Sequence, residues 1–133
     1  MKTSKFFGFW GLNFLAAVVV DFLWHGLIFS GVYGTAAAGT AARMANGKVM
    51  PLFWSIFLAE LLITLSGSYF LQKSTSPIRD GVIFVGLLLA FFGFLNHGIL
   101  STWPPTIIVL DILFGLVLGL VIGFITKWMV KNN

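Results

Sequence analysis

The sequence predicts an all-α integral membrane protein, an antiparallel bundle of four transmembrane helices with both termini in the cytoplasm. Composition, a series of long apolar runs and the placement of the basic residues lead to this prediction. Of the 133 residues, 59% are hydrophobic and 9% are charged, whereas about 25% are charged in an average soluble domain. So few charged residues cannot cover a fold with polar surface, and the composition therefore favours the bilayer over water.

Four apolar runs are long enough to cross a membrane, which takes roughly 20 residues of helix. We expect helices at about residues 6–30, 51–71, 77–100 and 105–129. The first run could also be a cleaved signal peptide, but it continues past any plausible cleavage point, so we interpret it as a membrane span. The length of the chain allows one membrane domain, residues 1–133.

The segments between these runs carry helix-boundary residues. Residues 31–50 are rich in Gly and Ala, and we expect an external loop or a short interfacial helix that ends at Asn46-Gly47. Pro51 and Ser76-Pro77 are suited to open the second and third helices. Pro104-Pro105 predicts a tight, stiff connection before the fourth helix.

The basic residues predict how the chain is oriented. With four antiparallel helices, six of the eight Lys and Arg side chains fall on one side of the membrane and two on the other. Cytoplasmic loops carry the excess of Lys and Arg, so both termini are expected inside. The six are Lys2, Lys5, Lys73, Arg79, Lys127 and Lys131, and the two are Arg43 and Lys48.

Each predicted helix brings an ionisable side chain into the membrane. Asp21 and His25 are separated by four residues and so share a helix face, while Asp111 lies a turn or so into the last helix. Such groups are costly in hydrocarbon unless they face inward and pair. We therefore predict one inward-facing polar site for a proton, a cation or a small polar ligand. Its residues are Asp21, Trp24, His25, Glu60, Asn96, His97 and Asp111.

Small residues recur on the same faces as the ionisable groups. Gly115, Gly119 and Gly123 follow Asp111 at every fourth residue, which gives the last helix a stripe without side chains. Gly86 and Gly93 predict a similar stripe on the third helix, continuing toward His97. Small residues let membrane helices approach closely, so these five glycines are predicted helix-packing positions.

Several chemistries fit the ionisable residues. An acid beside an imidazole can hold a proton, and the set Asp21, His25, His97 and Asp111 could ligate a metal ion. Two histidines on different helices could also ligate a haem iron. Alternatively, the histidines only lock the helix register, and Glu60 is a neutral acid bonded to Thr64 or to a backbone carbonyl.

Other functional classes receive no support. The chain has no cysteine, which excludes a thiol nucleophile, a disulfide and a Cys-based metal site. Nucleotide-binding and hydrolase motifs are absent, so the sequence favours a protein that is not an enzyme. The net charge of +4 comes from basic residues spaced singly between apolar runs, which does not indicate nucleic acid. No cofactor can be identified.

Two motifs resemble those of a known group of proteins. Trp24-His25-Gly26 ends the first predicted helix, and Asp111 begins the Asp-then-Gly pattern of the last. Together with Tyr33 and Arg43 they resemble a family of small, four-helix bacterial inner-membrane proteins of unknown function. The Gly/Ala-rich segment 34–42 departs from the bulkier loop expected there. The resemblance implies a bacterial four-helix fold without an assigned activity.

These observations give a main hypothesis and two alternatives. The main hypothesis is a multi-pass protein of the bacterial inner membrane whose polar intramembrane site serves transport. The first alternative is an accessory subunit whose small-residue faces dock a larger membrane partner. The second is a haem-bearing electron-transfer bundle. The expected partners are the lipid bilayer and either a second copy of the chain or a larger membrane complex.

Overall fold

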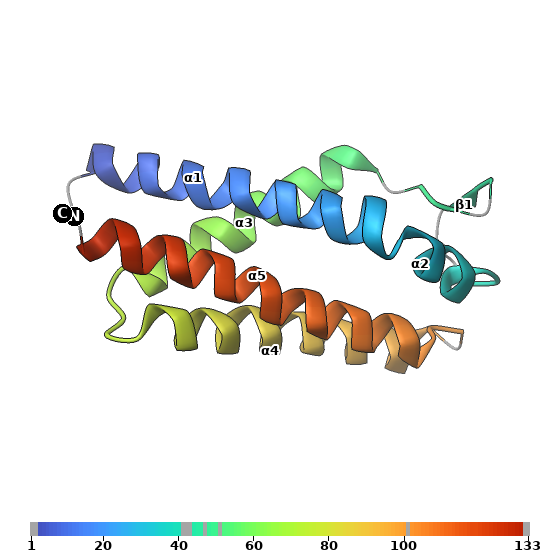
Figure 1. Ribbon diagram of the computed structural model, residues 1–133. Helices are drawn as coiled ribbons and strands as arrows, with labels where there is room; N and C mark the ends of the chain where they lie inside the picture. The colour runs from blue at the N-terminus through green and yellow to red at the C-terminus, as the bar shows by residue number, and fades with distance from the viewer. Residues whose placement is uncertain (1–2, 41–43, 47, 51, 101, 132–133) are drawn as a thin grey trace.

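The computed structural model is a bundle of long helices that lie side by side (Figure 1). It describes residues 3–40, 44–46, 48–50, 52–100 and 102–131. Four helical spans in this part of the chain are long and apolar enough to cross a membrane. Successive spans run in opposite directions and both termini lie at one end of the bundle (Figure 1). The predicted all-α membrane fold with four spans is therefore confirmed, while the placement of both termini in the cytoplasm stays a prediction.

Three of the four long helices, α3, α4 and α5, begin and end close to the predicted residues. α1 covers Thr3–Asp21, α3 Phe53–Leu71, α4 Pro77–Ile99 and α5 Pro105–Lys131. Pro77 and Pro105 are each the first residue of a helix, where the missing N–H of proline costs no hydrogen bond. The predicted opening residue of α3, Pro51, lies outside the described residues.

The first span differs from the single helix predicted at 6–30. α1 ends at Asp21 and passes directly into a π-helix, η1, at Phe22–Ile28. A separate helix, α2, follows at Ser30–Ala37. Part of the segment predicted as a loop or interfacial helix is therefore helical, and it begins earlier than expected.

A short hairpin follows α2 at the end of the bundle opposite the termini (Figure 1). Strand β1 (Met44–Ala45) pairs antiparallel with β2 (Lys48–Val49). Asn46 takes a positive φ of 51° in the turn between them, a conformation that asparagine tolerates well. Asn46 was predicted to end a helix, and this prediction is wrong because the residue lies in a hairpin turn.

α4 and α5 form the tightest helix pair, and their glycines explain why. A Cβ atom added to Gly119 would overlap the backbone of Gly81, and one added to Gly123 would meet the backbone of Pro77 and Ile78. Backbones this close leave no room for a side chain, as is typical of small-residue contacts in membranes. The glycine stripe of α5 therefore packs against α4 within the chain.

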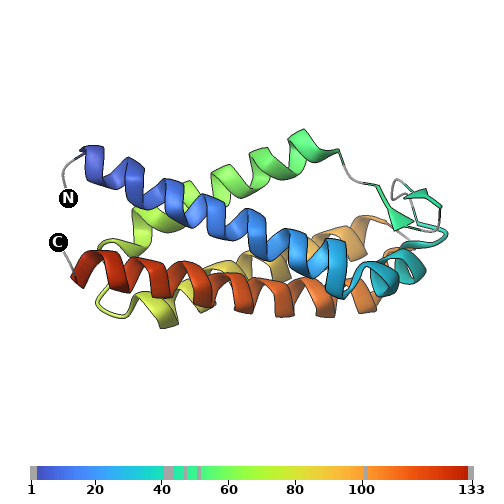
Figure 2. The same ribbon diagram turned by 45° about the horizontal axis from the view of Figure 1, so that its top comes forward.

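The third-helix glycines also face α5. A Cβ atom at Gly86 would meet the side chain of Leu116, and one at Gly93 would meet Ile108. By contrast, α3 makes a looser contact, and its beginning leans away from α4 and α5 (Figure 2). The α4–α5 pair is therefore the firm part of the bundle, on which α1 and α3 rest.

Large apolar side chains cover the outside of the bundle. Trp54 and Leu87 are each 66% exposed, while the interior centres on a cluster that includes Ala17, Leu118 and Ile122. An apolar exterior around a small core is the arrangement that lipid requires.

The glycine contact gives a first prediction. Gly119→Ala should lower the stability of the protein by about 1–3 kcal/mol, because the new methyl group forces α4 and α5 apart. Unfolding of the purified protein in detergent micelles by a denaturing detergent would measure this loss. Gly11→Ala is the matched control, since nothing lies within 4 Å of a Cβ there. Equal stability of the two variants would contradict the proposed role of the stripe.

Candidate functional site

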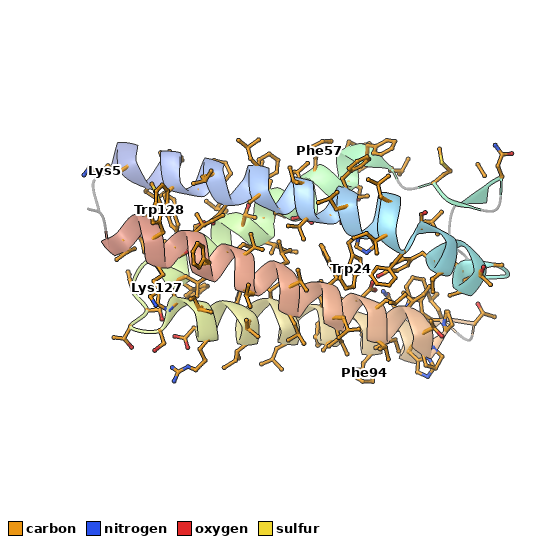
Figure 3. All side chains as sticks on the ribbon, in the orientation of Figure 1. Lys5, Trp24, Phe57, Phe94, Lys127 and Trp128 are labelled. Atoms are coloured by element: carbon orange, nitrogen blue, oxygen red, sulfur yellow. The ribbon has the colours of Figure 1, made fainter. Side chains whose placement is uncertain are left out.

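The π-helix at the end of the first span carries two of the predicted site residues. Its widened turn is seen in the backbone, where the N–H of Phe29 donates to the carbonyl oxygen of Trp24, five residues earlier, over 2.9 Å. π-helices are rare and are often found at functional sites. Figure 3 shows Trp24 between η1 and α5, where its ring and that of His25 both contact Phe114.

Asp21, His25, Tyr33 and Asp111 form a continuous hydrogen-bonded chain, which we call the polar cluster. Nδ1 of His25 lies 2.8 Å from Oδ1 of Asp21. Nε2 of the same ring lies 3.1 Å from the hydroxyl oxygen of Tyr33. That hydroxyl donates to Oδ1 of Asp111 over 2.6 Å. The cluster thus joins the end of α1, the π-helix, α2 and the beginning of α5.

The cluster is half-buried and partly enclosed by aromatic rings. The side chains of Asp21, His25 and Asp111 are 19%, 32% and 26% exposed. The ring of His25 lies with its centroid 4.7 Å from that of Phe114 and also 4.7 Å from that of Tyr33. The aromatic rings therefore shield the imidazole of His25, while each of the three side chains keeps some exposed surface.

Tyr33 is buried, and it belongs to a second core at this end of the bundle, with Ala37, Ile107 and Leu110. Burial, together with its hydrogen bond to Asp111, raises the pKa of the Tyr33 hydroxyl above its ordinary range. The hydroxyl therefore keeps its proton and acts as the donor to Asp111.

Glu60 is buried but stands apart from the polar cluster. Its side chain is 5% exposed, and its Oε2 has no hydrogen-bond partner among the described residues. The hydroxyl of Thr64 donates to the backbone oxygen of Glu60 over 2.7 Å. The predicted link between the two side chains is thus replaced by a link to the backbone.

The structure does not bring His97 and Asn96 into the polar cluster. His97 is exposed at the end of α4, and its Nδ1–H donates to the backbone oxygen of Trp103 over 2.7 Å. This bond closes the turn between α4 and α5. Asn96 is half-buried, and its backbone carbonyl oxygen accepts a hydrogen bond from the backbone N–H of Leu100. The inward direction predicted for His97 is therefore wrong, because the helix ends there and its backbone offers a nearer partner.

The predicted metal and haem sites depend on His97 joining His25. Within the described residues, no group of three or more His, Asp or Glu side chains is placed to hold a metal ion. Both ring nitrogens of His25 already contact oxygen atoms of Asp21 and Tyr33. An iron ion at this ring would therefore have to displace one of these contacts.

A second buried polar contact, between α1 and α3, was not predicted. The side-chain nitrogen of Asn13 donates to Oγ of Ser68 over 2.9 Å, and the indole N–H of Trp10 donates to Oγ1 of Thr64 over 3.2 Å. Asn13 is a polar residue within the first apolar run, and a polar side chain at membrane depth is the signal from which a partner on another helix could have been predicted. Arg43, which the sequence motif highlighted, lies outside the described residues.

Comparison with known proteins confirms the resemblance to a family of membrane proteins of unknown function. A family model described as "Predicted membrane protein (DUF2177)" matches residues 7–128. No curated protein and no solved structure matches the chain. The matched region reaches into all four candidate membrane spans. The chain is thus a multi-pass membrane protein, and it belongs to the DUF2177 family of predicted membrane proteins.

Proposed function

We propose that the polar cluster is an intramembrane proton-binding site. The proposal rests on one observation, the unbroken series of short contacts from Asp21 through His25 and Tyr33 to Asp111. The number of protons that this series needs can be counted from its donors and acceptors.

The count begins at Tyr33. Its single hydroxyl proton is used in the bond to Asp111, so the contact with Nε2 of His25 requires a proton on that nitrogen. A neutral imidazole has only this one N–H. Its Nδ1 would then present a lone pair to the Asp21 carboxylate at 2.8 Å, which is repulsive. One further proton must therefore lie between Nδ1 and Oδ1.

This proton can sit on either partner without breaking a contact. If it is on Nδ1, an imidazolium lies between two carboxylates. If it is on Oδ1, a carboxylic acid donates to a neutral ring. When two ionisable groups interact this strongly, the proton is lost from the pair as a whole and not from one residue alone. The cluster therefore binds one exchangeable proton, and removing it breaks the link between Asp21 and His25.

The side of the membrane follows from the basic residues. Lys5 and Lys127 lie at the end of the bundle that holds both termini (Figure 3), whereas the polar cluster lies toward α2 and the hairpin. If the basic end faces the cytoplasm of a bacterial cell, the cluster opens toward the outer face of the inner membrane. The proton would then be exchanged with the outside, as expected of a site that serves transport.

Magnetic resonance of the histidine nitrogens would test the proton count. In protein labelled with ¹⁵N-histidine, we expect His25 to carry protons on both ring nitrogens near neutral pH. Asp21→Asn should leave it with one, because the amide cannot stabilise the charged ring. The chain has two histidines, so His97→Gln would assign the signals and serve as the control. A neutral His25 ring in the unaltered protein, together with an ionised Asp21, would disprove the proposal.

Tyr33 provides an independent test of the hydrogen-bonded chain. Tyr33→Phe should lower the stability by about 1–3 kcal/mol, because Asp111 loses its donor and His25 loses its acceptor. Unfolding in detergent micelles would measure the loss. Tyr69, the other tyrosine of the chain, is 52% exposed, and Tyr69→Phe is the matched control. If the two variants unfold alike, the hydroxyl of Tyr33 does not bridge the cluster.

A further inference from the structure

α1 and α3 meet along a line of buried polar side chains, which we call the polar seam: Asn13, Glu60, Thr64 and Ser68. All four side chains are at most 5% exposed. On α3, Glu60, Thr64 and Ser68 are spaced at every fourth residue and so share one face. Hydrogen bonds from α1 to Thr64 and Ser68 fix this face against α1. The seam is thus an internal feature, shielded from lipid.

Glu60 lies between the rest of the seam and the polar cluster. α1 and α3 run in opposite directions (Figure 1), so the step from Ser68 to Glu60 leads the same way as the step from Asn13 to Asp21. Ala17, fully buried, stands between Asn13 and Asp21 on α1. Ala17 packs into the core with Phe114 and Leu118. Asp21 and His25 are near enough to Glu60 for their charges to influence its carboxyl group.

Two oxygen atoms of the seam lack partners. Oε2 of Glu60 and Oδ1 of Asn13 are buried and have no hydrogen-bond partner among the described residues. A buried polar group without a partner costs about 1–3 kcal/mol. Protonation of the Glu60 carboxyl, or a buried water molecule that donates to these oxygens, would remove this cost. Buried water is stable where several polar groups surround it.

Glu60 differs in this respect from the other acids. The chain contains four Asp and Glu residues in all. Asp21 and Asp111 are bonded within the polar cluster, and Asp80 is bonded to Ser74 and Arg79 near the start of α4. Glu60 is the acid that is most deeply placed between helices and least satisfied. Such intramembrane acids are typical of proton relays.

We propose that Glu60 is a second proton-binding residue, which exchanges protons with the Asp21–His25 pair and makes the polar seam a proton pathway toward the end that holds the termini. The inference deepens the proposed function and rests on it. In one transfer, the Asp21–His25 pair has first released its shared proton to the outside. The O–H bond of the Glu60 carboxyl then breaks, and a bridging water molecule passes the proton on to form the O–H bond of Asp21. The Glu60 carboxylate then regains a proton from the side of Asn13 and Ser68.

Proton flux into vesicles tests this pathway. Purified protein is reconstituted with a pH-sensitive dye inside, and a potassium gradient with valinomycin drives protons inward. We expect acidification with the unaltered protein and, with Glu60→Gln, its loss to the level of protein-free vesicles. Thr126→Val is the matched control, because the hydroxyl of Thr126 is also buried but bonds to Ile122 within α5. Flux that Glu60→Gln leaves unchanged would overturn the proposal.

Chemical labelling tests the same residue without a substitution. A hydrophobic carbodiimide reacts with protonated carboxyl groups in apolar surroundings. It should modify Glu60 and not Asp80, as mass spectrometry of the labelled protein would show, and the modification should stop the flux. Flux that persists after Glu60 is modified would contradict the pathway.

The two proposals can fail separately. If the vesicles containing unaltered protein do not acidify while His25 carries two protons by magnetic resonance, the pathway is overturned and the proton-binding cluster stands. If flux depends on Glu60 but His25 is neutral and Asp21 ionised, the cluster fails as a proton site, and the proposed exchange with it fails too.

Discussion

The cost of an unpaired charge in hydrocarbon governs the arrangement of this protein. Asp21 and Asp111 lie on helices far apart in the sequence, and His25 with Tyr33 fills the space between them. Asp21 finds its partner, His25, four residues along the same span. Asp111 on α5, by contrast, has its partner, Tyr33, on α2. The cluster therefore ties the first and last spans together at the end of the bundle that holds the hairpin.

The position of Asp111 depends in turn on the glycine contact between α4 and α5. Gly115 and Gly119 set the backbone of α5 against that of α4, so the face that bears Asp111 cannot rotate freely. The lack of side chains allows dispersion contacts along the whole line, which is the main attraction between helices in lipid. Because this contact is used within the chain, the same stripe is not free to dock a second copy or a larger partner.

The sequence predicted the spans and part of the site because both follow from local rules. Apolar length predicts a span, and spacing by four placed Asp21 beside His25. Tyr33 was named only as part of the family motif and not as a site residue, because its contact with Asp111 depends on how α2 packs against α5. His97 was misplaced because its estimated depth in the membrane does not show where the helix ends. At that end the backbone carbonyl of Trp103 binds the imidazole ring. The π-helix was not predicted either, because the apolar pattern of residues 22–28 does not distinguish it from an α-helix.

The polar cluster and the polar seam differ in a way that bears on function. In the cluster, every contact has a donor and an acceptor once one proton is bound, so the protonated state is well defined. In the seam, Glu60 and Asn13 retain unsatisfied oxygens, and each such oxygen costs free energy that an apolar side chain would not. Sites that break the rules of packing are where function is expected. In the proposed pathway, the satisfied cluster and the unsatisfied seam would hold a proton with unequal stability, so that Glu60 would release its proton more readily than the cluster does.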